Sequence, residues 1–211
     1  HLLELDVHSN NLRGTGAGIF IERVNNTEIH HNYVKVTASP LELTRGINDT
    51  SIDNNHLEST LLSNNATTVW SGSTLDANRI TFDNNIITSC AADTRSLWLS
   101  LTDFDDCSIR NNLFRFTSTG SAPMVIQIGM AASSLKFSGN RFIITGTTMV
   151  DRPLLDFTGG ANIAMNDNVV LSSSVQLKRS EIICENLQFN NNEIPGLLIN
   201  ATGKVYATKN I

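Results

Sequence analysis

The sequence predicts an all-β protein, a right-handed single-stranded parallel β-helix of about nine coils with a ladder of asparagines at one corner. Three observations predict this fold. One short motif returns along the whole chain of 211 residues, apolar residues alternate around it, and the chain contains 25 Asn, 20 Ser and 21 Thr. Asn favours turns and Thr favours strands, so this composition suits many short strands joined by turns rather than helices.

The repeated motif reads apolar, any, any, Asn, any, apolar. The residue three before the asparagine is apolar in all nine copies, and the residue two after it is apolar in the eight copies that reach that far. Such periodicity is typical of solenoids built from stacked coils. The asparagines are separated by 22, 23, 30, 27, 28, 28, 24 and 18 residues, and they are Asn10, Asn32, Asn55, Asn85, Asn112, Asn140, Asn168, Asn192 and Asn210.

Two short strands flank each asparagine. Apolar residues five and three before it, and two after it, indicate two strands that meet at a tight corner. A sharp corner needs left-handed backbone, which Asn accepts best after Gly, and stacked carboxamides can form a ladder. We therefore expect the asparagines to superpose at one corner. The residues three before them should form one buried row: Val7, Ile29, Ile52, Phe82, Ile109, Phe137, Met165 and Phe189.

A third strand precedes each pair. Alternating segments at 18–22, 41–43, 69–71, 97–101, 124–128, 154–157, 175–177 and 197–199 are the candidates. Because side chains alternate across a strand, one set of positions should face outward. The outward set is Phe20, Glu22, Glu42, Trp70, Trp98, Gln127, Asp156 and Gln176.

The repeat fills residues 1–211, which we interpret as a single β-helix domain. The chain begins and stops inside coils without a capping helix, so we expect it to be a fragment of a longer polypeptide. A net charge of −5 gives no basic surface for nucleic acid, and no apolar run is long enough for membrane insertion. Three cysteines without framework spacing indicate reduced thiols, and Cys107 falls on an inward row.

These repeats resemble those of the pectate-lyase-like right-handed β-helix superfamily. The uneven coils and the long turns at 58–68, 88–96 and 115–123 look most like those of bacteriophage tailspike or appendage proteins. The resemblance implies a homotrimer, located on the virion or outside the cell, that binds and often cleaves bacterial surface polysaccharide. The catalytic motifs of polygalacturonases are not present in order, and there is no calcium cluster with a catalytic Arg as in pectate lyases. We therefore expect no cofactor or metal.

The outward side of the third strand is the predicted site. Trp70 and Trp98 on neighbouring coils, with Gln127 beside them, suit a polysaccharide, because sugar C–H faces stack on aromatic rings and hydroxyls need fixed partners. If the groove is catalytic, the candidate acids and bases are Glu22, Glu42 and Asp156. The alternative is that long turns or a trimer neighbour cover the tryptophans.

A second polar face lies on the strand before the asparagine. Carboxylates beside imidazoles could perform acid–base chemistry there, although the same pattern is typical of a solvated outer face. Its residues are Asp6, His8, Glu28, His30, Asp53, Asp83 and Arg110.

Three functions remain open at this point. The first is a tailspike-like receptor-binding protein, with or without depolymerase activity. The second is an extracellular polysaccharide lyase or hydrolase unrelated to phage. The third is a structural shaft or adhesin segment without activity. Composition does not separate them.

Overall fold

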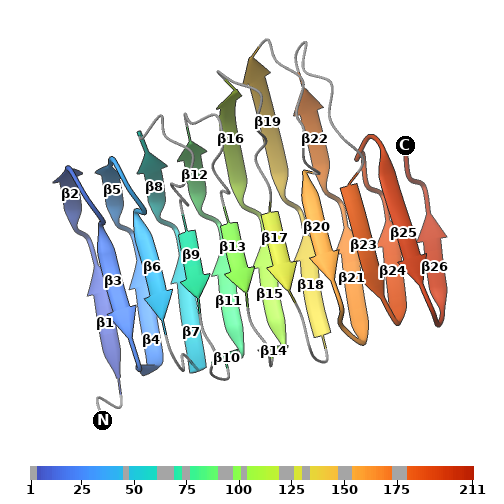
Figure 1. The fold of residues 1–211 in the computed structure, drawn as a ribbon, viewed down its shortest axis with the longest axis horizontal. Coiled ribbons are helices and arrows are strands. Elements are labelled where there is room, and N and C mark those ends of the chain that lie inside the picture. Colours follow the sequence, from blue (N-terminus) through green and yellow to red (C-terminus); the bar gives the residue numbers. More distant parts are fainter. Residues whose placement is uncertain are drawn as a thin grey trace.

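The computed structural model describes residues 4–44, 48–60, 69–72, 77–89, 97–100, 104–118, 126–129, 134–146, 154–172 and 180–211. These residues contain strands and no helix, and nearly all strands belong to three long parallel sheets that run side by side along the molecule (Figure 1). The prediction of an all-β parallel solenoid is therefore confirmed.

Sheet A contains the strand before each asparagine. Its nine strands, in spatial order, are β1 (Leu5–His8), β4 (Asn25–His30), β7 (Asn48–Asp53), β11 (Ile80–Asp83), β15 (Cys107–Arg110), β18 (Ser134–Ser138), β21 (Asn162–Asn166), β24 (Asn186–Asn190) and β26 (Val205–Thr208). Sheet B contains the strand after each asparagine. Its seven strands are β2 (Asn11–Gly14), β5 (Tyr33–Val36), β8 (His56–Ser59), β12 (Ile86–Ser89), β16 (Leu113–Ser118), β19 (Arg141–Gly146) and β22 (Val169–Ser172).

Sheet C completes each coil. Its eight strands are β3 (Ile19–Glu22), β6 (Leu41–Thr44), β9 (Val69–Gly72), β13 (Leu97–Ser100), β17 (Ile126–Gly129), β20 (Leu155–Thr158), β23 (Ser180–Cys184) and β25 (Leu197–Ala201). A small two-stranded sheet pairs β10 (Ala77–Asn78) with β14 (Phe104–Asp105).

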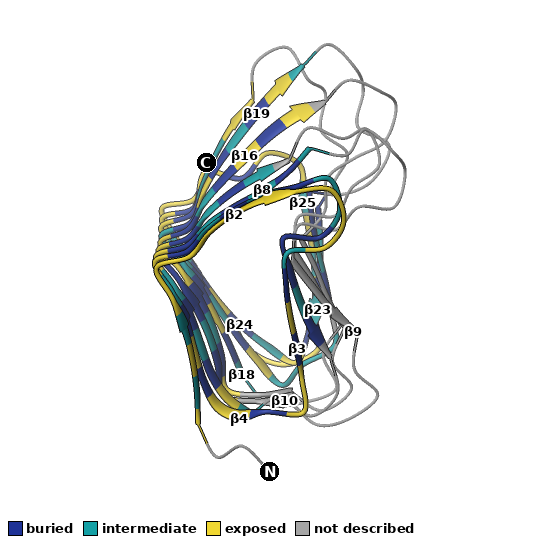
Figure 2. Cartoon of the chain, turned by 90° about the vertical axis from the view of Figure 1, so that its left-hand side faces the viewer, coloured by how far each residue is buried: buried dark blue, intermediate teal, exposed yellow. Residues whose placement is uncertain are grey.

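The chain winds as a right-handed helix. Seen from the N-terminal end, it passes through sheet A, turns at the asparagine corner into sheet B, and returns along sheet C while moving away from the viewer (Figures 1 and 2). Over the described ranges, seven coils supply a strand to all three sheets, the eighth supplies two and the ninth supplies one. Nine asparagine motifs therefore correspond to seven complete three-strand coils.

The asparagines superpose at one corner, as predicted. Each side-chain amide donates to the Oδ1 atom of the next asparagine, from Asn10 to Asn210, at 2.8–3.3 Å. Each Oδ1 atom from Asn32 onward also accepts the backbone N–H of the preceding asparagine. Seven of the nine asparagines are buried, from Asn32 to Asn192.

The position of the left-handed backbone differs from the expectation. It is not the ladder asparagine but the residue before it that turns the chain, with φ between 50° and 65°. The asparagine recurs because its carboxamide bridges coils, whereas the left-handed position tolerates several residue types. Those residues are Ser9, His31, Asn54, Asn84, Asn111, Gly139, Asp167, Asn191 and Lys209.

The predicted core row is confirmed by the register of sheet A. Val7 pairs with Ile29, and the row continues coil by coil to Phe189. All members except half-buried Val7 are buried. Phe137 lies at the centre of the aromatic packing, with ring centroids 6.2 Å from Phe142 and 5.2 Å from Phe157. Cys107 is also buried in the core, as expected, and burial raises its pKa well above the usual value.

One predicted strand of sheet C is misplaced. The strand that pairs with β20 is β23, five residues after the start of the predicted segment, and residues 175–177 lie outside the described residues. The segment at 175–177 alternates apolar and polar residues, whereas β23 reads Ser-Glu-Ile-Ile-Cys and does not, although burial alternates along it, so sequence alternation favours 175–177 over β23. Glu181, not Gln176, therefore lies opposite Asp156.

Candidate functional site

The outward positions of sheet C lie in one continuous register. Phe20 pairs with Glu42, Glu42 with Trp70, and Trp70 with Trp98. The series continues through Gln127, Asp156 and Glu181 to Leu198. We call these eight positions the sheet C row: Phe20, Glu42, Trp70, Trp98, Gln127, Asp156, Glu181 and Leu198.

Both ends of the sheet C row face outward. Phe20 is 55% exposed and Leu198 is 39% exposed, while Glu42 is half-buried between buried Leu41 and Leu43. Asp156 is half-buried between two buried neighbours in the same way. The strand positions of Trp70, Trp98 and Gln127 are described, but the predicted direction of their side chains lies outside the described residues.

The three candidate catalytic carboxylates do not share one place. Glu22 pairs with Thr44, whereas Glu42 pairs with Phe20, so Glu22 and Glu42 are two positions apart along their strands. The Glu22 carboxylate is 3.8 Å from Arg23 Nε. Asp156 lies four strands from Glu42, about 19 Å away at the usual strand spacing.

A carboxylate pair that the sequence reasoning missed lies on the sheet C row. Asp156 and Glu181 occupy facing positions on adjacent strands, and both are half-buried. Because the backbones of facing positions are about 4.8 Å apart, the two carboxyl groups can approach the separation found in retaining glycosidases, about 5–5.5 Å. Its sequence signal was weak, because β23 reads Ser-Glu-Ile-Ile-Cys and does not alternate between polar and apolar residues as 175–177 does.

The second polar face is also assembled as predicted, on the outside of sheet A. The His8 and His30 rings stack at 5.2 Å, and His30 Nε2 lies 3.0 Å from Asp6 Oδ1. His30 Nδ1 lies 2.8 Å from His31 Nδ1, so one of these two imidazoles donates to the other. Farther along, the half-exposed Arg110 guanidinium binds the nearly buried Asp83 carboxylate through Nε and Nη2. These contacts pair Asp6 with His30 and Asp83 with Arg110 within the face.

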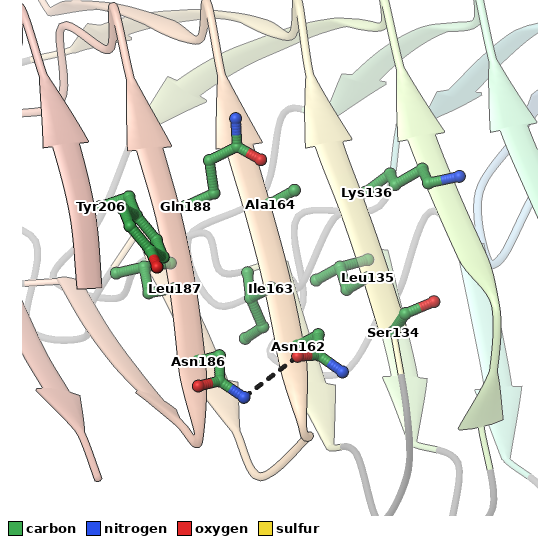
Figure 3. A pocket seen from close by; sticks show the side chains of 10 residues that line it. All are labelled: Ser134, Leu135, Lys136, Asn162, Ile163, Ala164, Asn186, Leu187, Gln188 and Tyr206. Carbon is green, nitrogen blue, oxygen red and sulfur yellow. Dashed lines mark hydrogen bonds between the residues drawn. The ribbon is translucent and has the colours of Figure 1, made fainter. Parts of the chain in front are cut away.

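A shallow groove of about 260 Å³ lies on sheet A among the C-terminal coils (Figure 3). Ala164 forms its floor, because its small side chain lies in register between Lys136 and Gln188. Tyr206, 62% exposed, follows Gln188 in the same register. We call this the Tyr206 groove, and the sequence reasoning did not single it out. The sequence does contain a signal for it: among the residues four before each asparagine, Ala164 stands between the long side chains of Lys136 and Gln188.

In the part of the chain that the structure describes, no three His, Cys, Asp or Glu side chains are grouped to hold a metal ion. The same residues form no helix of the length and hydropathy that crossing a bilayer would require.

Comparisons with protein-family models, with curated proteins and with solved structures find no match to the chain.

Proposed function

We propose that this β-helix is a tailspike-like receptor-binding protein that recognises bacterial surface polysaccharide along the sheet C row. The observation that carries the proposal is the unbroken register of Glu42, Trp70, Trp98, Gln127 and Asp156. The location that goes with this function is the virion or the extracellular space, and the assembly that goes with it is a homotrimer.

The geometry of a parallel solenoid supports a linear polymer as the ligand. Strands repeat every ~4.8 Å along the axis, so the row offers evenly spaced positions along a straight line. Aromatic residues supply flat apolar surfaces for sugar C–H faces, and carboxylates and amides supply partners for hydroxyl groups. Trp70 and Trp98 occupy paired positions on adjacent strands, with Glu42 and Gln127 next in line on either side.

Depolymerase activity is a second candidate function, supported by the Asp156–Glu181 pair. Two carboxyl groups about 5 Å apart can act as nucleophile and general acid in a retaining glycoside hydrolase. Glu22 and Glu42, which the sequence favoured, occupy different register positions, so the adjacent pair is the better candidate.

Binding is tested by incubating wild-type protein and Trp98→Ala with a panel of capsule and O-antigen polysaccharides. We expect Trp98→Ala to lose about tenfold in affinity with an unchanged circular dichroism spectrum, because stacking on an aromatic ring is removed. Tyr33→Ala, an aromatic change on the outer face of sheet B, should bind as the wild type does. Equal affinity of Trp98→Ala and wild type would refute the proposed site.

Activity and assembly are tested with the same polysaccharides and the intact protein. New reducing ends that disappear in Asp156→Asn and Glu181→Gln would support hydrolysis at this pair, and products with a conjugated double bond would indicate a lyase. Binding without cleavage would leave a receptor-binding function. A monomer of the intact protein in light scattering would argue against the tailspike assignment.

A further inference from the structure

The outer face of sheet A in the C-terminal coils is organised in three parallel rows. On one side of the Tyr206 groove, Asn186 Nδ2 donates to Asn162 Oδ1 at 3.1 Å, and Asn186 Oδ1 accepts the Lys204 backbone N–H at 2.9 Å. On the other side, Asn190 Nδ2 donates to Asn166 Oδ1 at 3.1 Å and Thr208 Oγ1 donates to Asn190 Oδ1 at 2.8 Å. Two hydrogen-bonded amide rows therefore border the groove.

The middle row differs from both borders. The side chains of Lys136, Gln188 and Tyr206 make no hydrogen bond or ion pair to another residue that the structure describes. Their polar groups are exposed to solvent, so they can bind a ligand without breaking a contact in the protein. Ala164 between them leaves room on the sheet surface, and Figure 3 shows Tyr206 and Gln188 on one side of Ala164 and Lys136 on the other.

The charge of the groove is opposite to that of the chain. The protein has a net charge of −5 with 20 acidic residues, yet the ten residues that line the groove include no Asp or Glu and one Lys. Among the residues that line the groove, a carboxylated ligand meets one cation and no like charge, and Asp106, the carboxylate beyond its edge, accepts a hydrogen bond from Ser134 Oγ.

We propose that the Tyr206 groove is a second sugar site, which binds a carboxylated pyranose such as a uronate unit. The choice of a sugar rests on the proposed polysaccharide-binding function. The pyranose ring lies on Ala164, with its C–H face toward Tyr206 and a hydroxyl group hydrogen-bonded to the Gln188 amide. Its carboxylate projects to the rim, where the Lys136 side chain extends away from Tyr206 (Figure 3).

The groove is tested by NMR titration of the isotope-labelled chain with trigalacturonate and, as a neutral probe of the same size, with galactotriose. We expect trigalacturonate to shift the backbone amides of β18, β21, β24 and β26, and galactotriose to bind about tenfold more weakly. Lys136→Met should remove the preference for the acidic probe. Tyr206→Ala should weaken binding of both probes about tenfold, because the stacking surface is lost.

Ala164→Leu is a steric variant that fills the floor of the groove, and it should abolish both sets of shifts. Ala164 is half-buried and faces outward, and Tyr206→Ala provides an independent readout if the leucine variant folds poorly. Tyr33→Ala is the matched control and should bind both probes as the wild type does. No shift on the four strands with saturating trigalacturonate, or unchanged binding in Tyr206→Ala, would overturn the inference.

Failure of the groove inference can be distinguished from failure of the proposed function. If Trp98→Ala weakens polysaccharide binding and the groove variants have no effect, the sheet C proposal stands and the groove inference fails. If trigalacturonate binds the groove while Trp98→Ala has no effect on polysaccharide binding, the groove is the sugar site and the proposal for sheet C fails.

Discussion

Asn140 shows why an asparagine recurs at the corner of this solenoid. Its Nδ2 atom donates to the Ile109 carbonyl at 2.9 Å and to Asn168 Oδ1 at 3.0 Å. Its Oδ1 atom accepts both the backbone N–H of Asn112 and the Asn112 side-chain amide. Because every polar group of the carboxamide is bonded and the residue is fully buried, no other side chain of this size can replace it.

Replacing Asn140 with Ala should therefore destabilise the protein strongly. We expect a loss of about 2–6 kcal/mol in the free energy of unfolding, since at least two buried groups lose their partners at about 1–3 kcal/mol each. Urea denaturation measures this loss. Ser138→Ala, two residues away on the outer side, should change stability by less than about 0.5 kcal/mol. A small effect of Asn140→Ala would mean that water replaces the carboxamide at this corner.

His56 links stability to pH. Its ring packs edge-on against Tyr33 at 4.9 Å. Burial disfavours the charged form and lowers the pKa of His56; Glu58 raises this pKa, and Arg115 and Lys35 lower it. The unfolded chain therefore binds the proton first. Stability is fully present above the usual histidine pKa of about 6.5 and falls as the pH drops through the lower folded value.

The measurement is urea denaturation of wild type and His56→Phe between about pH 7.5 and pH 5. The phenylalanine variant keeps an aromatic ring beside Tyr33 but has no titrating group. We expect its stability to fall less toward acid pH than that of the wild type. Parallel curves for the two proteins would exclude His56 as a source of the pH dependence.

At the scale of strands, the strongest sequence signal was also the most accurate. The residue three before each asparagine is apolar in every copy, and the structure stacks these residues in one register, because a shift by one residue would move the whole row to the solvent side. Glu181 was missed for a physical reason. Sheet C begins at a variable distance from the asparagine, and the residues of β23 do not alternate between polar and apolar as those of 175–177 do, so only the pairing of β23 with β20 identifies it.

Phe137 tests the core row. Phe137→Ala removes a fully buried ring between Phe142 and Phe157, and we expect a loss of about 3–5 kcal/mol in the free energy of unfolding from lost burial and a cavity. Lys136→Ala, next to it on β18 but exposed, should cost less than about 0.5 kcal/mol. A loss below about 1 kcal/mol for Phe137→Ala would contradict the inward register of this strand.

At the scale of the whole molecule, the candidate sites depend on stacking that the sequence shows only in part. The Tyr206 groove exists because four strands place Lys136, Ala164, Gln188 and Tyr206 side by side, although 70 residues separate the first from the last. Aligning the asparagines predicts which residues lie side by side on successive strands, but not which of their side chains make no hydrogen bond. That property depends on the side-chain rows on either side.

Coils that contact only their neighbours should open locally. Each strand of sheet A pairs only with the strands of the preceding and following coils, so destabilising one coil should affect mainly its two neighbours. In Asn140→Ala we expect faster hydrogen exchange at β15, β16, β21 and β22, and unchanged exchange at β1, β2, β4 and β5. Mass spectrometry of peptides from these segments measures the difference. Uniformly faster exchange would show that the solenoid unfolds as one cooperative unit.

The asparagine ladder also gives the solenoid an electrical direction. Every link has the same sense, with the amide of one coil donating to the oxygen of the next coil toward the C-terminus. Aligned amide dipoles add, as peptide dipoles do along a helix, and each polarises its neighbours. The ladder is therefore one coupled array rather than eight independent bonds. Once one asparagine is lost, the next one along the array stabilises the fold less than it did before, so the energetic costs of neighbouring substitutions do not add.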